Sequence, residues 1–523
     1  MSGAADPATP ARKSEFLITA SLFLVSTAIL YLAIINDDWQ DPYIHFRAGE
    51  RIARGDVPYK DVFLFWFPGA PLALAAWFKL FGTSLAGLQI LQALCAGAGV
   101  TLGWLIARLT IPSPIRIAVP FVLGGAYVVG NQGLNHMSFS APLALLAIYA
   151  ALQARPTGSW TWCLTAGAAA GLAGMFTITT GAWLGVALVA SAACFAERRL
   201  RSGLLIAAGG ASVLALLLVY LLATGVLQEF VASAIVWPRE RYAPFHAGVG
   251  WGAWLPSWEM LDAIPEAWKA TWFLTLCLVW GQTYVLPAIV IVSIALFPMR
   301  KQRQPERLIL LLAATALILS AFPNAAPMRL VRLSGPLWLL ILYELSTFAD
   351  GSRRGQFVAA SAFILVFAAI LPLQWSYRHQ LTALQTPRGT ARVQPLAVME
   401  YQTLEKAMPP ESRVAIMPEY RPAAWLLKYD NPTRFDTLTP VLYSPAQLQQ
   451  ACDDLAAAGY PPVVYFTASE LATIDSVKRS FGPSKYVEEW DQNPLRDLLS
   501  QRYNVALQDP PMVILKAKPV SAR

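Results

Sequence analysis

The feature that most constrains this chain is a series of apolar runs, each about 17 to 25 residues long, spread over residues 1–376. An α-helix needs a run of this length to cross the hydrocarbon core of a bilayer. The composition agrees, since 56% of the residues are hydrophobic and only 14% are charged. The sequence therefore predicts a polytopic α-helical membrane protein.

About eleven segments are expected to be transmembrane helices. They are residues 15–36, 84–107, 115–131, 138–154, 160–177, 180–196, 202–225, 271–298, 308–322, 333–349 and 355–376. The first follows Arg12 and Lys13 and could be mistaken for a secretion signal, but it is long for one and no small-residue cleavage site follows it. We expect it to remain as a helix of the protein.

Basic residues in alternate short loops predict the orientation, because such loops face the cytoplasm. The residues concerned are Arg108, Arg116, Arg155, Arg198, Arg199, Arg201, Arg300, Lys301, Arg303, Arg307, Arg353 and Arg354. With a cytoplasmic N-terminus, two long loops, residues 37–83 and 226–270, and the tail from residue 377 lie on the outer face. The net charge of +8 is then a topology signal, and nucleic acid is not an expected partner.

The tail, residues 377–523, changes to a soluble composition and predicts a small α/β domain after the membrane domain of residues 1–376. Apolar runs at 413–417, 462–466 and 512–516 are typical of buried strands. Segments 446–458 and 468–480 have helical spacing, and Ser444 before Pro445 fits a helix start. The tail has no phosphate loop or nucleophile motif, and the five cysteines of the chain indicate neither a disulfide framework nor a zinc cluster. A structural or acceptor-docking role is expected for it.

The first outer loop concentrates the ionisable residues, in the stretch NDDWQDPYIHFRAGERIARGDVPYKD, residues 36–61. Asp41 and Pro42 look like the cap and first residue of a helix. One face of that helix is apolar and the other carries three arginines, so we expect an interfacial helix with its cationic side toward water or phosphate. The apolar residues are Ile44, Ala48 and Ile52, and the arginines are Arg47, Arg51 and Arg54. A second interfacial helix is expected over residues 68–80.

Asp41 could serve only as a helix cap, a role worth about 1 kcal/mol. A cap, however, does not require the other carboxylates of the same loop, Asp37, Asp38, Asp56 and Asp61. A cluster of this kind suits chemistry, because one carboxylate can act as a general base on an acceptor hydroxyl. A second can orient the acceptor or hold a divalent metal.

The order of motifs in this loop resembles the GT-C superfamily of polyprenyl-phosphate-dependent glycosyltransferases, above all the bacterial branch related to protein O-mannosyltransferases and to the aminoarabinose transferase of lipid A. After the acidic helix start come a Gly-Asp at 55–56, a Tyr-x-Asp at 59–61, a Pro-Gly-x-Pro-Leu at 68–72 and a Phe-Gly at 81–82. The resemblance implies that Asp41 is the catalytic base, with Asp38 as the substitute, and that Asp61 binds substrate or metal. Asp41-Pro42 stands where several relatives have Asp-Glu, which leaves a metal requirement open.

Transfer from a lipid phosphate needs cations to neutralise the departing phosphate, and arginine suits this task. The outer loops offer Arg239, Arg241, His246, Arg329 and Arg332. The alternative for these residues is contact with lipid headgroups. A solitary histidine such as His45 or His246 is more often a packed or solvated side chain than a ligand.

The resemblance implies an inverting transfer of a sugar from a polyprenyl-phosphate donor to a glycan, lipid or protein acceptor, at the outer face of a bacterial plasma membrane. A ligase or polymerase that uses lipid-linked glycans is the first alternative, although such enzymes usually rely on a large loop between late spans. A transporter is the second alternative. Transporters tend to place ionisable groups near the membrane midplane, whereas these spans hold almost none, apart from Glu344 near an inner end.

Overall fold

The computed structural model describes residues 9–33, 40–111, 114–129, 133–195, 199–243, 305–321, 331–348, 352–417, 421–438, 442–466, 493–509 and 512–519. The chain divides into two compact units. The first unit contains Met1–Ile35, Leu88–Leu217 and Ser257–His379. The second contains Asn36–Gly87, Leu218–Pro256 and Gln380–Arg523, so the first outer loop and the tail belong to one unit.

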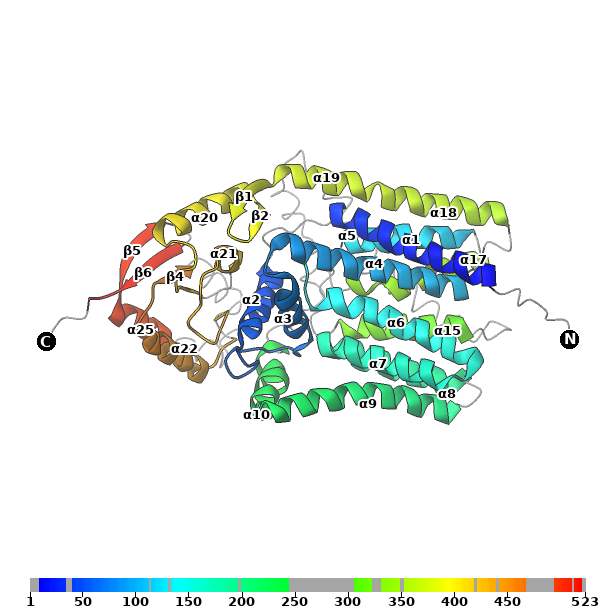
Figure 1. Ribbon diagram of the computed structural model, residues 1–523, viewed down its shortest axis with the longest axis horizontal. Coiled ribbons are helices and arrows are strands. Elements are labelled where there is room, and N and C mark those ends of the chain that lie inside the picture. The colour runs from blue at the N-terminus through cyan, green and yellow to red at the C-terminus, as the bar shows by residue number, and fades with distance from the viewer. Residues whose placement is uncertain are drawn as a thin grey trace, which may run out of the picture. The chain divides into compact units, whose positions relative to one another are not determined.

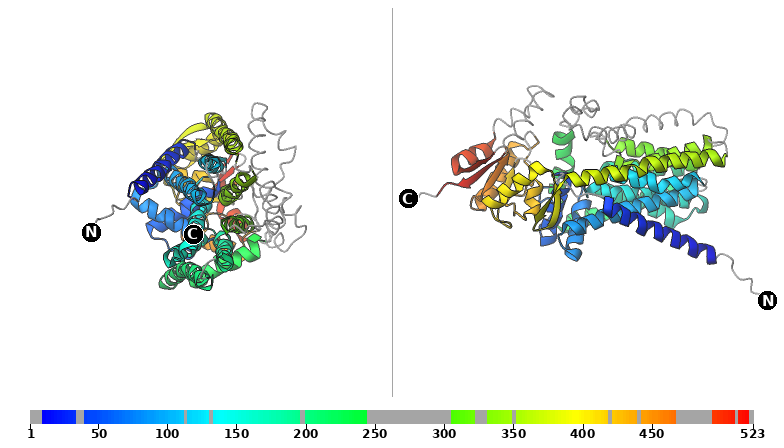
Figure 2. Two further views of the ribbon diagram at one scale, coloured as in Figure 1. Left: turned by 90° about the vertical axis from the view of Figure 1, so that its right-hand side faces the viewer. Right: turned by 90° about the horizontal axis from the view of Figure 1, so that it is seen from above.

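The described part of the first unit is helical, and its long helices run alongside one another (Figure 1; Figure 2, left, views them nearly end on). Its helices are α1 (Thr9–Ala33), α4 (Leu85–Thr110), η1 (Ile115–Ala118), α5 (Val119–Val129), α6 (His136–Thr157), α7 (Trp160–Phe176), α8 (Ile178–Phe195), α9 (Arg199–Ala223), α15 (Pro305–Ser320), α17 (Gly335–Phe348), α18 (Arg353–Ala368) and α19 (Ile370–Gln380). α4 begins in the second unit, and α9 and α19 end in it.

Four of these helices are long and apolar enough to cross a membrane: Ser14–Ala33 within α1, α4, α6 and α9. The prediction of a helical protein with several membrane spans is therefore confirmed. The other expected spans fall on shorter helices, except residues 271–298, which lie outside the described residues. The count of eleven stays a prediction.

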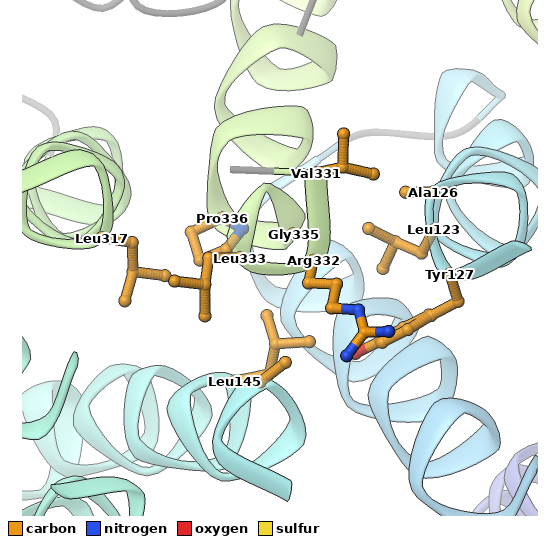
Figure 3. Close-up of a pocket in the computed structure, with 11 residues that line it drawn as sticks. Leu123, Ala126, Tyr127, Leu145, Leu317, Val331, Arg332, Leu333, Gly335 and Pro336 are labelled. Atoms are coloured by element: carbon orange, nitrogen blue, oxygen red, sulfur yellow. The ribbon is translucent and has the colours of Figure 1, made fainter. Parts of the chain in front are cut away.

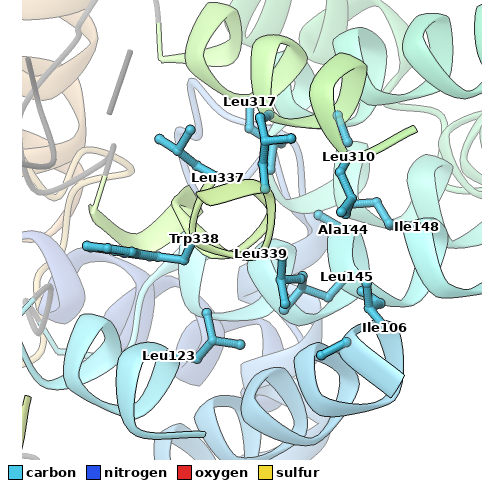
Figure 4. Packing of buried hydrophobic residues seen from close by; sticks show 14 of the residues in the cluster. Ile106, Leu123, Ala144, Leu145, Ile148, Leu310, Leu317, Leu337, Trp338 and Leu339 are labelled. Atoms are coloured by element: carbon cyan, nitrogen blue, oxygen red, sulfur yellow. The ribbon is translucent and has the colours of Figure 1, made fainter. Parts of the chain in front are cut away.

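The core of the first unit forms where α4, α6, α15 and α17 meet (Figure 4). Leu339 of α17 packs in one cluster with Ile106, Leu145 and Leu310, and each of these side chains is at most 2% exposed. Because lipid tails are as apolar as leucine, close packing contributes more than water exclusion to holding such helices together.

Glycines let α7 and α9 approach closely. A Cβ atom added at Gly167 of α7 would lie 1.9 Å from the carbonyl oxygen of Ile206, and one at Gly209 of α9 would lie 2.3 Å from that of Leu164. Small residues at a helix crossing allow backbones to touch, which is a common way for membrane helices to associate. Only glycine fits at these two positions without a shift of the helices.

One ion pair is buried between α15 and α17. Arg307 Nε donates a hydrogen bond to Glu344, and the two side chains are 3% and 8% exposed. Pairing makes the burial of two charges tolerable. A second pair, Arg155 with Glu306, is about a third exposed.

The second unit combines helices of the outer loops with the mixed structure of the tail (Figure 1). Its elements are α2 (Gln40–Arg54), α3 (Gly69–Phe81), α10 (Leu227–Phe230), η2 (Val231–Val236), η3 (Pro238–Tyr242), β1 (Thr382–Thr386), β2 (Gly389–Val393), α20 (Pro395–Ala407), β3 (Ala415–Met417), α21 (Pro422–Leu426), α22 (Pro445–Ala457), β4 (Val463–Phe466), α25 (Pro494–Arg502), β5 (Tyr503–Asp509) and β6 (Met512–Ala517). η2 and η3 are π-helical.

A four-stranded sheet in the order β3-β4-β6-β5 forms the centre of the tail. β3 and β4 are parallel, with Ala415 opposite Val463, and the other neighbours are antiparallel. The three predicted strands are confirmed as β3, β4 and β6. The predicted helix start is also confirmed, because Ser444 Oγ accepts a hydrogen bond from the backbone N–H of Gln447 (3.3 Å) at the start of α22. Segment 468–480 lies outside the described residues.

Candidate functional site

The expected base lies at the start of the first-loop helix. α1 ends at Ala33 and α2 begins at Gln40, so Asp41 is the second residue of α2 and the helix starts earlier than expected. The N-terminus of a helix carries a partial positive charge that favours a negative group there. Asp38 lies outside the described residues.

Two arginines of the cationic face of α2, Arg47 and Arg51, do not point to water, contrary to the expectation from its amphipathic pattern, whereas the Arg54 side chain is 50% exposed. The Arg47 side chain is 2% exposed, and its Nη2 lies 3.1 Å from Asp430 Oδ1 while its Nε lies 3.8 Å from Asp436 Oδ1. Ala48, on the expected lipid-facing side, is also buried. The carboxylates of the tail take the place of water, because a buried guanidinium needs acceptors of opposite charge.

Arg51 ties the end of α2 to the turn that follows it. Its Nε donates to Asp56 Oδ2 and its Nη2 to the backbone oxygen of Asp61, both at 2.7 Å. Its Nη1 donates to the backbone oxygen of Thr433 of the tail, also at 2.7 Å. Arg51 thereby holds three segments of the second unit together.

Asp61 closes the turn and keeps one oxygen available. Its Oδ2 accepts a hydrogen bond from the backbone N–H of Val57 (2.8 Å), and its own N–H donates to the Val57 carbonyl (2.9 Å). The side chain is half-buried, and Oδ1 makes no hydrogen bond within the described part of the chain. A half-buried carboxylate with a spare oxygen can still accept a hydrogen bond from a ligand.

Arg434 of the tail lies beside this turn and bonds to the backbone oxygen of Tyr59. Burial lowers the pKa of Arg434, and the nearby carboxylates of Asp454, Asp61 and Glu229 oppose that shift. Acidic groups of the first loop, the second outer loop and the tail thus lie near one half-buried cation.

His45 lies one helical turn after Asp41, and the sequence offers no reason to assign it a charge state. It is buried, and its ring centroid lies 4.6 Å from that of Trp66. Burial lowers the pKa of His45 to about 3, so the imidazole is neutral near pH 7. This agrees with the interpretation of His45 as a packed side chain.

The second outer loop contributes an aromatic cluster. Trp237 is buried between the rings of Phe65 and Tyr443, at centroid distances of 4.9 and 5.7 Å. The following π-helical turn carries both predicted arginines, with Arg239 exposed and Arg241 half-buried. π-Helical turns are rare and are frequent at functional sites.

An open apolar groove of about 620 Å³ lies where α9 ends and α10 and η2 begin. It is lined by Leu221, Leu222, Gly225, Leu227, Gln228, Val231, Ala232 and Val236. Its last lining residue, Val236, precedes Arg239 by three residues, which is less than one turn of this π-helical segment. The groove therefore offers hydrocarbon contacts close along the chain to an exposed cation.

Arg332 lies in the first unit and is buried. Its Nη2 donates to the backbone oxygen of Gly133 (3.0 Å) and its Nη1 bonds to Asn135, the N-cap residue of α6. It lines a cavity of about 10 Å³, the size of one water, in which its guanidinium lies beside Tyr127 (Figure 3). His246 and Arg329 lie outside the described residues.

In the described ranges, no three His, Cys, Asp or Glu side chains gather in a group that could hold a metal ion. The metal requirement therefore stays open.

The structure also adds residues that sequence reasoning missed, namely Glu50, Arg388, Asp430, Arg434 and Asp436. For Arg388, the Pro-Arg-Gly sequence at 387–389 indicates a hairpin turn. The residues adjacent to these five side chains in the sequence do not indicate which partners they contact.

Comparison with known proteins gives structural likeness only. No family model and no curated protein matches the chain. It is similar to ArnT from Cupriavidus metallidurans bound to undecaprenyl phosphate, with 12% identity and a TM-score of 0.46 over 97% of this chain and 99% of that one. It is also similar to the arabinofuranosyltransferase AftD from Mycobacteria, with 16% identity and a TM-score of 0.48 over 96% of this chain and 40% of that one. A third match is the arabinosyltransferase EmbB from Mycobacterium smegmatis, with 13% identity and a TM-score of 0.42 over 73% and 43%.

Proposed function

We propose that this protein is an inverting glycosyltransferase that moves a sugar from a polyprenyl-phosphate donor to an acceptor hydroxyl at the outer face of the membrane. The observation that carries the proposal is the apolar groove that ends three residues before Arg239, in the same compact unit as the acid-bearing helix α2. A donor of this class has a hydrocarbon chain for such a groove and an anionic head for an arginine. The motif order of the first loop, which resembles the GT-C superfamily, supports the same assignment.

In the proposed reaction, Asp41 takes the proton of the acceptor hydroxyl while that oxygen attacks the anomeric carbon of the sugar. The bond between the anomeric carbon and the phosphate oxygen breaks, and polyprenyl phosphate leaves with the bonding electron pair. Arg239 and Arg241 would neutralise the leaving phosphate, and Asp61 would orient the acceptor. A single displacement of this kind inverts the anomeric configuration.

Four further residues complete the proposal. Asp38 is the substitute base, and His246 and Arg329 are further candidates to contact the phosphate. Arg332 is also a candidate, although its guanidinium already donates to the backbone and side chain at the start of α6. Each of these four roles is tested by a single substitution in the assay below.

The test is release of polyprenyl phosphate by purified protein, followed by mass spectrometry with a panel of polyprenyl-phosphate sugars and a membrane extract as the source of acceptor. Undecaprenyl phosphate, the ligand named for one of the similar structures, is the first carrier to use. We expect release by the wild type and a loss of at least about 100-fold in Asp41→Asn, within the range that a general base contributes. Full activity in both Asp41→Asn and Asp38→Asn, or a product with retained configuration, would contradict the proposed mechanism.

Asp497→Asn is the matched control for the acid. Asp497 is exposed and lies in the first turn of α25, so its replacement removes a helix-terminal carboxylate of the same kind outside the first loop. It should leave release unchanged. For the phosphate role, the double variant Arg239→Ala and Arg241→Ala should raise the KM for the donor, whereas Arg353→Ala, an exposed arginine at the start of α18, should not.

Transfer of whole glycan blocks, visible in the length of the product, would favour the ligase or polymerase alternative. Transport without release of polyprenyl phosphate would favour the transporter alternative. The product mass spectrum therefore separates these alternatives from the addition of a single sugar.

A further inference from the structure

A small hairpin in the tail has no other strand to support it within the described residues. β1 and β2 pair antiparallel from Thr382 opposite Val393 to Thr386 opposite Gly389, and neither strand joins another sheet in that part of the chain. The two-residue loop consists of Pro387 and Arg388, and Gly389 takes the positive φ of +114° that follows it. An isolated two-stranded hairpin is at best marginally stable, so other contacts must hold this one.

The Arg388 side chain at the tip of this hairpin is buried and held on several sides. Its Nη2 lies 2.6 and 2.7 Å from the two carboxylate oxygens of Glu50 in α2, and these two side chains are 2% and 6% exposed. Its Nε donates to the backbone oxygen of Trp425 (3.1 Å), and its guanidinium carbon lies 4.6 Å from the centre of the Trp425 ring.

The same tip contacts the loop between α3 and α4. Arg388 Nη1 bonds to the Thr83 hydroxyl, and the Arg388 backbone oxygen accepts a hydrogen bond from the N–H of Leu85 (3.0 Å). The hairpin thus places one arginine between α2 and the loop that follows α3. The contacts of Arg388 with Glu50, Thr83 and Leu85 support the hairpin.

The tail holds α2 at two further points. Arg47 pairs with Asp430, and Arg51 donates to the backbone oxygen of Thr433. Together with Glu50, these residues occupy two successive turns of the helix, so contacts from the tail restrict both its rotation and its sliding along its axis. Arginine is suited to this role because its planar fork binds a carboxylate in one geometry.

We propose that Arg388 is a positioning residue for the transfer reaction, acting through Glu50 and α2 on the orientation of Asp41. This inference rests on the proposed function. Glu50 lies nine residues after Asp41, about 13.5 Å along the helix axis, so a tilt or rotation of α2 displaces its first turn. A misplacement of about 1 Å at the reacting groups can cost about 100-fold in rate.

The test is a double-mutant cycle of Arg388→Gln, Glu50→Gln and the double variant in the full-length protein. We expect kcat for polyprenyl-phosphate release to fall about 10- to 100-fold in each single variant, while the KM for the donor changes less than about twofold. The double variant should lose less than the product of the two single losses, because both changes break the Arg388–Glu50 contact, while Glu50→Gln also removes the Arg54–Glu50 pair. Arg502→Gln, an exposed arginine of α25, is the control and should keep the kcat of the wild type.

Hydrogen–deuterium exchange of a peptide covering residues 43–54 supplies a second readout that does not depend on the reaction. Exchange in this peptide should rise in Arg388→Gln and stay unchanged in Arg502→Gln. If Arg388→Gln does not fold, Arg388→Lys is used instead, since it keeps the charge and loses the fork, and it should show the same changes to a smaller extent.

Three outcomes would overturn the inference: kcat unchanged in folded Arg388→Gln, losses in the two single variants that multiply in the double variant, or exchange in α2 that does not change. A wild type that releases polyprenyl phosphate from no donor would contradict the proposed function instead. In that case, hydrogen–deuterium exchange of residues 43–54 is the measurement that tests whether Arg388 holds α2 in place.

Discussion

The close approach of α7 and α9 predicts that a Gly→Ala substitution lowers the stability of the protein at Gly167, whereas the same substitution at Gly185 of α8 does not. Each Gly→Ala change in a helix interior is worth about 1 kcal/mol in favour of the folded state where space permits. At Gly185 of α8, no atom lies within 4 Å of the added Cβ, so this gain should be realised. At Gly167, the added Cβ would lie 1.9 Å from the Ile206 carbonyl oxygen, where ordinary contacts begin at 3.4 Å.

The Ile206 oxygen belongs to the backbone of α9, so it cannot move away by a change of side-chain rotamer. The two helices must therefore separate by about 1.5 Å, the difference between those two distances. Overpacking costs about 1–3 kcal/mol, and separation also removes neighbouring contacts. We expect Gly167→Ala to be less stable than the wild type by up to about 2 kcal/mol after the helix-propensity gain is included.

The assay is thermal unfolding of detergent-solubilised protein, followed by tryptophan fluorescence and by loss of monomer on size-exclusion chromatography. Gly167→Ala should unfold at a lower temperature than the wild type, and Gly185→Ala at the same or a higher temperature. If Gly167→Ala were as stable as Gly185→Ala, the inference of a glycine-dependent helix contact would be refuted.

Two further predictions concern charge. Glu344→Gln removes the carboxylate that Arg307 contacts in the first unit and should destabilise the protein by about 3–5 kcal/mol. Glu306→Gln, in a partly exposed pair, should cost less than about 1 kcal/mol. Equal unfolding temperatures for the two variants would contradict this prediction. Because burial lowers the pKa of His45 from 6.5 to about 3, its contribution to stability is fully present above pH 6.5 and is lost as the pH falls toward 3. His45→Gln should therefore show a flatter dependence of unfolding temperature on pH between about pH 6.5 and 5 than the wild type, and a parallel curve would count against a buried neutral imidazole.

The buried ion pairs of the second unit bear on the expected role of the tail. The sequence indicates a separate domain from residue 377 with a structural or acceptor-docking role. In the structure, Arg388, Asp430 and Thr433 of the tail contact α2 directly. The tail therefore has a physical route to influence the proposed catalytic helix without touching the substrate.

Several elements were predictable because their signals are local. The thickness of a bilayer sets the length of an apolar run, which identifies α1, α4, α6 and α9. The helix start at Ser444 depends on residues three positions apart, and buried strands such as β4 are short apolar runs. By contrast, the hairpin strands TALQT and GTARV contain no continuous apolar run, which is why they were not expected.

The membrane-helical class, the short buried strands of the tail and the acidic first loop could be predicted, because each depends on the spacing or composition of neighbouring residues. Which groups those charges meet depends on contacts between segments far apart in the chain. The three-arginine face of α2 predicts a solvated surface, yet Arg47 pairs with Asp430, and Glu50 pairs with Arg388, a residue 338 positions away in the chain. Periodicity identifies the face of a helix, but the partner of a charge depends on how distant segments pack.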